Sequence, residues 1–205
     1  MAVSKRTMLE GVALCRPFAQ GDLDNLCGLY AAINALCLVS APVRPLNRRE
    51  ARHVLNAGMS YLQRRNWLSD AVLHGMNVQR QRAVTRHMAK AAGQIAGFKF
   101  SAVQPLPGKS KMATDAALSL IAQRVENGAA FIANLENTFW HYTVISGLSN
   151  SRIYLFDSDG LSWIERSSFG ICGSQVRARH CISLASLTEL SLVRREWPKG
   201  SCASC

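Results

Sequence analysis

Hydrophobic residues recur at helical spacing through the first half of the chain. The run over 27–36 is rich in small and apolar residues and ends before Pro42, which predicts a compact, buried helix. After Gly128 the period changes, and short β-branched or aromatic runs alternate with turn residues. Further helices are predicted over 51–62, 80–92 and 111–127, and strands over 98–103, 129–135, 141–146, 152–157, 161–165, 181–184 and 190–194.

The order of these elements predicts an α+β fold, because helices come first and antiparallel strands follow. The last predicted helix has Ser110 as its N-cap, and Gly128 ends it. We expect one domain over 1–205, with a mainly helical half over 1–110. The second half, 111–205, then supplies a helix and an antiparallel sheet.

Composition excludes several classes of protein. The chain has 205 residues, of which 48% are hydrophobic, as in a globular domain and unlike a disordered chain. Its longest uncharged apolar stretch, 26–43, is broken by Asn34, Ser40 and Pro42, so we expect no integral membrane segment. The N-terminus has no continuous apolar region typical of a signal peptide, which favours a cytoplasmic location or delivery as an effector by another route.

The cysteines predict free thiols in a reducing compartment, because their number, 7, is odd and their spacing is irregular. Cys202 and Cys205 form a C-x-x-C pair without a second half, and a structural zinc site needs about four ligands. We therefore interpret the pair as an incidental feature of the tail. No cluster at metal-ligand spacing and no glycine-rich phosphate loop occurs, so we expect neither a metal nor a cofactor.

Positive charge is concentrated in one region. Between Arg44 and Lys90, ten Lys and Arg residues face only Glu50 and Asp70, so this region holds +8 of the net charge of +11. A solvated helical face that favours solubility is the simpler interpretation, and a surface for an acidic partner is the alternative. Nucleic acid is not favoured as that partner, since the aromatic residues that usually accompany basic ones are sparse there.

A candidate nucleophile stands where a loop becomes a helix. Cys27 begins the predicted helix over 27–36, and the unpaired backbone N–H groups of a helix N-terminus stabilise a thiolate. Gly28 beside it would let a substrate backbone approach closely. The alternative is that Cys27 is a buried structural thiol, a common role for free cysteine.

Two further polar residues complete a catalytic arrangement. His141 opens one predicted strand and Asp157 closes the next, so a hairpin would place them at the same end of neighbouring strands. Asp159 is a rival for orienting the imidazole, and the alternative for Asp157 is a plain turn former, because Asp is common in turns. The side-chain amide of Gln20, together with the Cys27 backbone N–H, could bind an oxyanion.

These residues carry a resemblance to the papain-like cysteine peptidase superfamily, and within it to the bacterial C39-like peptidases. The pattern is Gln20-(x6)-Cys27-Gly28-(x5)-Asn34-Ala35 on the nucleophile side, and His141-Tyr-Thr-Val-Ile-Ser-Gly followed by Tyr-Leu-Phe-Asp157-Ser-Asp159-Gly on the base side. The resemblance covers about 18–36 and 129–164. It implies a papain-like fold in which the nucleophile helix packs on a C-terminal antiparallel sheet. It also implies an oxyanion hole at Gln20 and a Cys27–His141–Asp157 triad.

One departure from the family pattern concerns charge. The loop before the nucleophile carries two acids, Asp22 and Asp24, whose negative field would oppose a thiolate if they pointed inward.

The leading functional hypothesis is a hydrolase, either a peptidase or an amidase, that acts on a protein or peptide substrate through a thioester. A second hypothesis keeps the same residues and changes the acceptor, as in papain-like deamidases, transglutaminases or acyltransferases of toxins and effectors. A third is a non-catalytic binding module that uses the basic 44–90 region.

Overall fold

A curved antiparallel sheet joins strands from both ends of the chain. The structure is a computed structural model, and it describes residues 6–21, 24–106, 112–137, 139–172 and 178–193. Within these residues the strand order is β2–β9–β3–β4–β5–β6, with β1 paired to the end of β4. A separate parallel pair is formed by β7 and β8. The strands are β1 (Thr7–Met8), β2 (Lys99–Val103), β3 (Ala130–Leu135), β4 (His141–Leu148), β5 (Arg152–Leu155), β6 (Trp163–Glu165), β7 (Phe169–Ile171), β8 (His180–Ile182) and β9 (Thr188–Val193).

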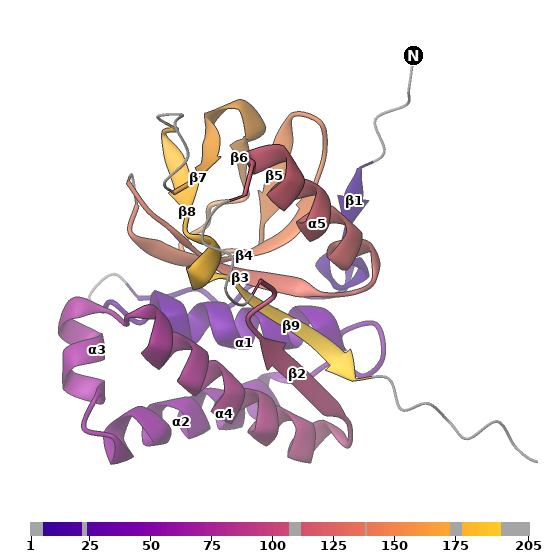
Figure 1. The fold of residues 1–205 in the computed structure, drawn as a ribbon. Coiled ribbons are helices and arrows are strands. Elements are labelled where there is room, and N and C mark those ends of the chain that lie inside the picture. Colours follow the sequence, from indigo (N-terminus) through magenta and orange to yellow (C-terminus); the bar gives the residue numbers. More distant parts are fainter. Residues whose placement is uncertain (1–5, 22–23, 107–111, 138, 173–177, 194–205) are drawn as a thin grey trace, which may run out of the picture.

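Helices cover both faces of the sheet. The helix α1 (Cys27–Ser40) lies against β3, β4 and β9, and α2 (Arg48–Arg64), α3 (Leu68–His74) and α4 (Val78–Ala96) lie beyond it (Figure 1). The helix α5 (Thr114–Glu126) packs against β1, β3 and β4 on the other side. As a result every residue of β4 after His141 is buried, as expected for a strand covered on both faces.

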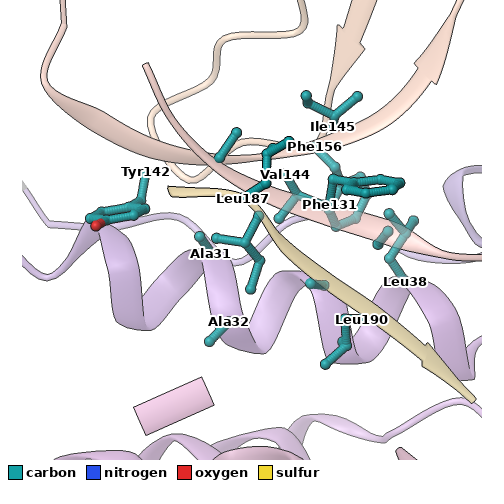
Figure 2. Close-up of a cluster of buried hydrophobic side chains, with 14 of the residues drawn as sticks. Ala31, Ala32, Leu38, Phe131, Tyr142, Val144, Ile145, Phe156, Leu187 and Leu190 are labelled. Atoms are coloured by element: carbon teal, nitrogen blue, oxygen red, sulfur yellow. The ribbon is translucent and has the colours of Figure 1, made fainter. Parts of the chain in front are cut away.

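The main hydrophobic core lies between α1 and the sheet. Ala31, Ala32 and Leu38 of α1 meet apolar side chains of β3, β4 and β9 (Figure 2). Small residues on the helix allow its backbone to approach the strands closely. Tyr142 of β4 points to the helix side, so the start of β4 lies against the N-terminal end of α1.

A buried amide ties the segment before α1 to the middle of that helix. Asn34 is fully buried, and its side chain accepts a hydrogen bond from Phe18 N at 2.7 Å and donates one to Phe18 O at 3.1 Å. Both polar groups of the amide are thereby satisfied inside an apolar core. This pairing fixes the path of the chain towards Cys27.

The structure confirms the predicted α+β class and corrects several boundaries. The helix α5 begins at Thr114 and not at residue 111, because Ala113 has extended backbone angles; Ser110 lies outside the described residues. The strand β5 ends at Leu155, two residues earlier than predicted. The mainly helical half also supplies β1 and β2, so the sheet is not built from 111–205 alone. No helix among the described residues has the length and apolarity needed to cross a membrane.

Candidate active site

Cys27 is the first residue of α1, as the sequence predicts. The turn before it is closed by Asp24, whose Oδ1 accepts a hydrogen bond from Leu26 N at 3.0 Å. The Sγ atom of Cys27 accepts a hydrogen bond from Tyr142 N at 3.5 Å, which links the thiol to the start of β4. Only 9% of the residue is exposed. The thiol therefore lies at the junction of helix and sheet.

His141 and Asp157 are in direct contact. The distance from His141 Nε2 to Asp157 Oδ2 is 2.8 Å, and the side chains are 15% and 1% exposed, respectively. Although β5 ends at Leu155, Phe156 N donates to Val144 O at 2.8 Å, so the chain continues beside β4 and brings Asp157 level with His141. The predicted pairing is thus present, although Asp157 follows the strand and does not close it.

The second oxygen of Asp157 anchors the turn after it. Asp157 Oδ1 accepts hydrogen bonds from Asp159 N at 2.8 Å and from Leu161 N at 3.3 Å. The residue therefore combines two roles that the sequence posed as alternatives, orienting the imidazole and forming the turn. Asp159, the rival for the first role, takes part through its backbone.

The environment favours a charged imidazole. Burial lowers the pKa of His141, but the hydrogen bond with Asp157 and the interaction with Cys27 outweigh it and raise that pKa to about 10. Conversely, burial raises the pKa of Asp157, and its contacts with His141 outweigh this and lower it below the ordinary value. The nearby Thr143 hydroxyl adds to that lowering. Since Nε2 is occupied by the carboxylate, Nδ1 is the nitrogen left for proton exchange with Cys27.

Gln20 lies beside Ser158, the residue after Asp157, but its side chain is hydrogen-bonded within its own loop. Its backbone N donates to Ser158 O at 2.9 Å, and its side-chain Nε2 donates to Asp24 O at 2.6 Å. Its Oε1 is buried and has no hydrogen-bond partner among the described residues. An amide nitrogen carries two donors, so one N–H remains for an oxyanion. Asp22, the other acid of this loop, lies outside the described residues.

Gly28 has a different role from the one predicted. A Cβ at this position would lie 2.9 Å from Met76 Cε, 3.1 Å from Gln81 Cγ and 3.2 Å from Tyr142 Cδ2. The space beside Gly28 is filled by the protein's own side chains. The glycine therefore permits close packing of α1 and not the approach of a substrate backbone.

Two aromatic residues next to His141 escaped the sequence reasoning. Phe139, His141, Asp157 and Leu161 line a pocket of about 230 Å³. Trp140 is 70% exposed and has a φ of 47°, an uncommon conformation for a bulky residue. The aromatic residues directly before His141 were the available sequence signal. Phe139 gives the pocket an apolar wall, and Trp140 is exposed next to it in the chain.

A larger pocket, of about 710 Å³, lies elsewhere, between α4 and β2. Three cations, Arg86, Lys90 and Lys99, line it together with Phe98 and Phe100. Part of the predicted basic region thus borders a concave surface with both charged and apolar walls.

One group of residues outside the site has metal-ligand geometry. Glu136, Cys172 and Cys181 each offer a ligand atom, and these atoms lie within 4.8 Å of one another. Sequence spacing did not reveal the group, because the residues come from three separate segments.

The structure brings together three of the four predicted site residues, Cys27, His141 and Asp157, and places Gln20 next to Ser158. Two histidines outside the site, His87 and His180, stack on the rings of Tyr61 and Phe139, respectively. A comparison with protein-family models, curated proteins and solved structures finds no significant match to this chain.

Proposed function

We propose that the protein is a papain-like cysteine-nucleophile hydrolase, a peptidase or amidase that works through a thioester. The observation that carries the proposal is the 2.8 Å contact of His141 with the buried carboxylate of Asp157, at the start of the strand whose next residue, Tyr142, donates its backbone N–H to the thiol of Cys27. Nucleophilic catalysis by cysteine needs a base beside the thiol and a third group that orients the base. Cys27, His141 and Asp157 fit these three roles.

The proposed reaction has two stages. The Cys27 thiol gives its proton to His141 Nδ1, and sulfur attacks the carbonyl carbon of the substrate. His141 then passes that proton to the leaving amine as the C–N bond breaks and a thioester remains. In the second stage a water molecule gives a proton to His141, attacks the thioester and displaces the thiol, which regains the proton. Asp157 keeps the imidazole oriented throughout.

Stabilisation of the oxyanion is assigned to the start of α1. The N–H groups of the first helical turn have no partners within the helix, and they point out of its N-terminus. The backbone N–H of Cys27 and the remaining side-chain N–H of Gln20 are the proposed donors. The exposed rim at Phe139 and Trp140 would favour substrates with an apolar group near the scissile bond.

Selective alkylation tests the proposal. The full-length protein is treated with iodoacetamide between about pH 5 and 7, and each cysteine is followed by mass spectrometry. We expect Cys27 to react at least about tenfold faster than Cys15 or Cys37, because the proposal gives Cys27, unlike these two, an imidazole as its base. Cys37 is a matched reference on the same helix, since burial and the nearby Cys15 raise its pKa to about 12.

The decisive control is His141→Ala, which should remove the advantage of Cys27 and leave the other thiols unchanged. If Cys27 reacts no faster than Cys15 in the unmodified protein, the proposal fails. If Cys27 is hyper-reactive as expected, the reaction type can be identified from the products formed with candidate substrates. Water as acceptor indicates hydrolysis, whereas transfer to an added amine indicates a transglutaminase or acyltransferase, and loss of ammonia from a side-chain amide indicates a deamidase.

A second candidate function is a binding module for an acidic partner. It is supported by the pocket between α4 and β2, where Lys90 and Lys99 are exposed beside two phenylalanines. Binding of an acidic peptide should weaken steeply with salt and be lost in the Lys90→Gln/Lys99→Gln double variant. Arg49→Gln/Arg52→Gln, which removes the same number of charges at exposed positions of α2, is the matched control for charge. Equal binding by all three proteins would exclude this function.

A further inference from the structure

Glu136, Cys172 and Cys181 form a compact group away from the candidate active site. The distance from Cys172 Sγ to Cys181 Sγ is 2.9 Å, and that from Cys172 Sγ to Glu136 Oε2 is 3.1 Å. Glu136 follows β3, Cys172 follows β7, and Cys181 lies within β8. Three chain segments therefore place two thiols and a carboxylate at one point.

Backbone hydrogen bonds hold the three residues in place. Glu136 N donates to Cys181 O at 2.8 Å, and Cys172 N donates to Ile182 O at 2.9 Å. The parallel pairing of β7 with β8 adds further restraint. The fold therefore holds the backbone of all three residues close together.

Two thiols and a carboxylate lie within 4.8 Å of one another at this point. The two sulfur atoms are closer than an ordinary van der Waals contact, although Cys172 can donate its S–H to the carboxylate. A cation at this point would instead stabilise two thiolates and a carboxylate together.

We propose that Glu136, Cys172 and Cys181 bind a divalent metal ion of borderline softness, with zinc as the best match. Zinc takes thiolate sulfur at about 2.3 Å and carboxylate oxygen at about 2.0–2.2 Å. The tetrahedral geometry sets neighbouring ligand atoms about 3.5–3.8 Å apart, so the two pairs that include Cys172 must separate by less than about 1 Å. Each thiol loses its proton to solvent as its sulfur–metal bond forms, and no electron is transferred. A water molecule takes the fourth position.

The carboxylate distinguishes this site from a disulfide. A disulfide between Cys172 and Cys181 needs a thiolate as the attacking group, and an adjacent negative charge disfavours thiolate formation. A metal site makes use of Glu136 as its third ligand. Metal binding would also tie the connection between β3 and β4 to the β7–β8 pair, close to the ring of Phe139 that stacks on His180 at 5.2 Å.

Cobalt substitution and zinc competition test the proposal without any measurement of activity. Reduced, metal-free, full-length protein is titrated with Co²⁺, which gives thiolate charge-transfer absorption when it binds cysteine, and with Zn²⁺ against a chromophoric chelator. We expect one equivalent to bind. Cys172→Ser and Cys181→Ser should each abolish the charge-transfer band, and Glu136→Gln should weaken zinc binding by at least about tenfold.

Two variants control for the other thiols. Cys27→Ser removes the candidate nucleophile, and Cys202→Ser/Cys205→Ser removes the C-x-x-C pair of the tail. Both should bind metal as the unmodified protein does. Circular dichroism checks that each variant is folded. If a serine variant does not fold, the loss of zinc affinity in the shape-conserving Glu136→Gln tests the site instead.

Three results would overturn the proposal. One is the absence of a thiolate band in the unmodified protein. Another is a band that survives in Cys172→Ser and disappears in Cys202→Ser/Cys205→Ser. The third is a Cys172–Cys181 disulfide that forms in air and persists with equimolar Zn²⁺, detected as a mass lower by two hydrogens.

Discussion

The contact between His141 and Asp157 can be tested by removing one negative charge while keeping the shape of the side chain. In Asp157→Asn the Oδ1 atom can still accept hydrogen bonds from Asp159 N and Leu161 N. The amide nitrogen then faces His141 Nε2 in place of Oδ2, now 2.8 Å away. His141 Nε2 must then accept a hydrogen bond from this amide N–H instead of donating one to a carboxylate, which favours the neutral imidazole.

The expected change is a lower pKa of His141. An opposite charge at this distance shifts a pKa by about one to three pH units. The pKa of His141 should therefore fall from about 10 towards the ordinary value of 6.5. Each pH unit corresponds to about 1.4 kcal/mol, so the charged imidazole loses about 1.4–4 kcal/mol. The lower end is favoured because water still reaches part of the ring.

The effect on stability has a defined pH window. The raised pKa of His141 stabilises the folded protein fully below about pH 6.5 and ceases to do so as the pH rises through about 10. The lowered pKa of Asp157 stabilises it above about pH 3.8, and this is lost as the pH falls through the folded-state value. The unfolding free energies of the two proteins should therefore differ most between about pH 4 and 6.5.

NMR titration of the imidazole, assigned with His141→Gln, measures the pKa directly, and urea unfolding at about pH 5.5 and pH 9.5 measures stability. Asp159→Asn is the matched control, because Asp159 contributes its backbone N–H to this turn and its side chain is exposed. An unchanged pKa of His141 in Asp157→Asn, or an equal loss of stability at both pH values, would refute the reasoning.

Three further substitutions test how the fold is held around α1 and α2. In Gly11→Ala, a Cβ would lie 2.0 Å from Leu38 O, so the backbone must shift, and urea unfolding should show a loss of about 1–3 kcal/mol. In Asn34→Ala, the partly buried Phe18 backbone loses both partners; we expect a loss of about 1–3 kcal/mol and faster hydrogen exchange at the Phe18 amide. Asn47→Ala removes the capping box of α2 and should lower the thermal midpoint by an amount that corresponds to about 1 kcal/mol.

The parts of the fold that follow local patterns were predictable from the sequence. A long run of small and apolar residues predicts the helix α1, and the change of period after Gly128 predicts the strands that follow. The positions of His141 and Asp157 could be related because a hairpin connects neighbouring strands directly. Exact ends were less accurate, since they depend on single backbone angles such as the extended conformation of Ala113.

The features that sequence reasoning missed depend on contacts between distant segments. The packing of Met76 and Gln81 against Gly28 arises from the way α4 and the loop before it cross α1. Likewise, Cys172 and Cys181 show no recognisable ligand spacing, and only the pairing of β7 with β8 brings them together. Such contacts have no local signature in a single sequence.

The basic region shows why net charge alone is a weak guide to binding. Arg44 pairs with Glu50 at 2.6 Å, and Arg80 pairs with Asp70, so both acids of the region are neutralised inside it. Arg82 donates to two backbone carbonyls just before β9 and acts as a link between α4 and the sheet. Several cations thus serve the fold itself, which supports the simpler interpretation of the charge. At the pocket between α4 and β2, by contrast, exposed lysines lie beside two phenylalanine side chains. A binding hypothesis for this protein therefore has to be tested at that pocket and not by the total charge.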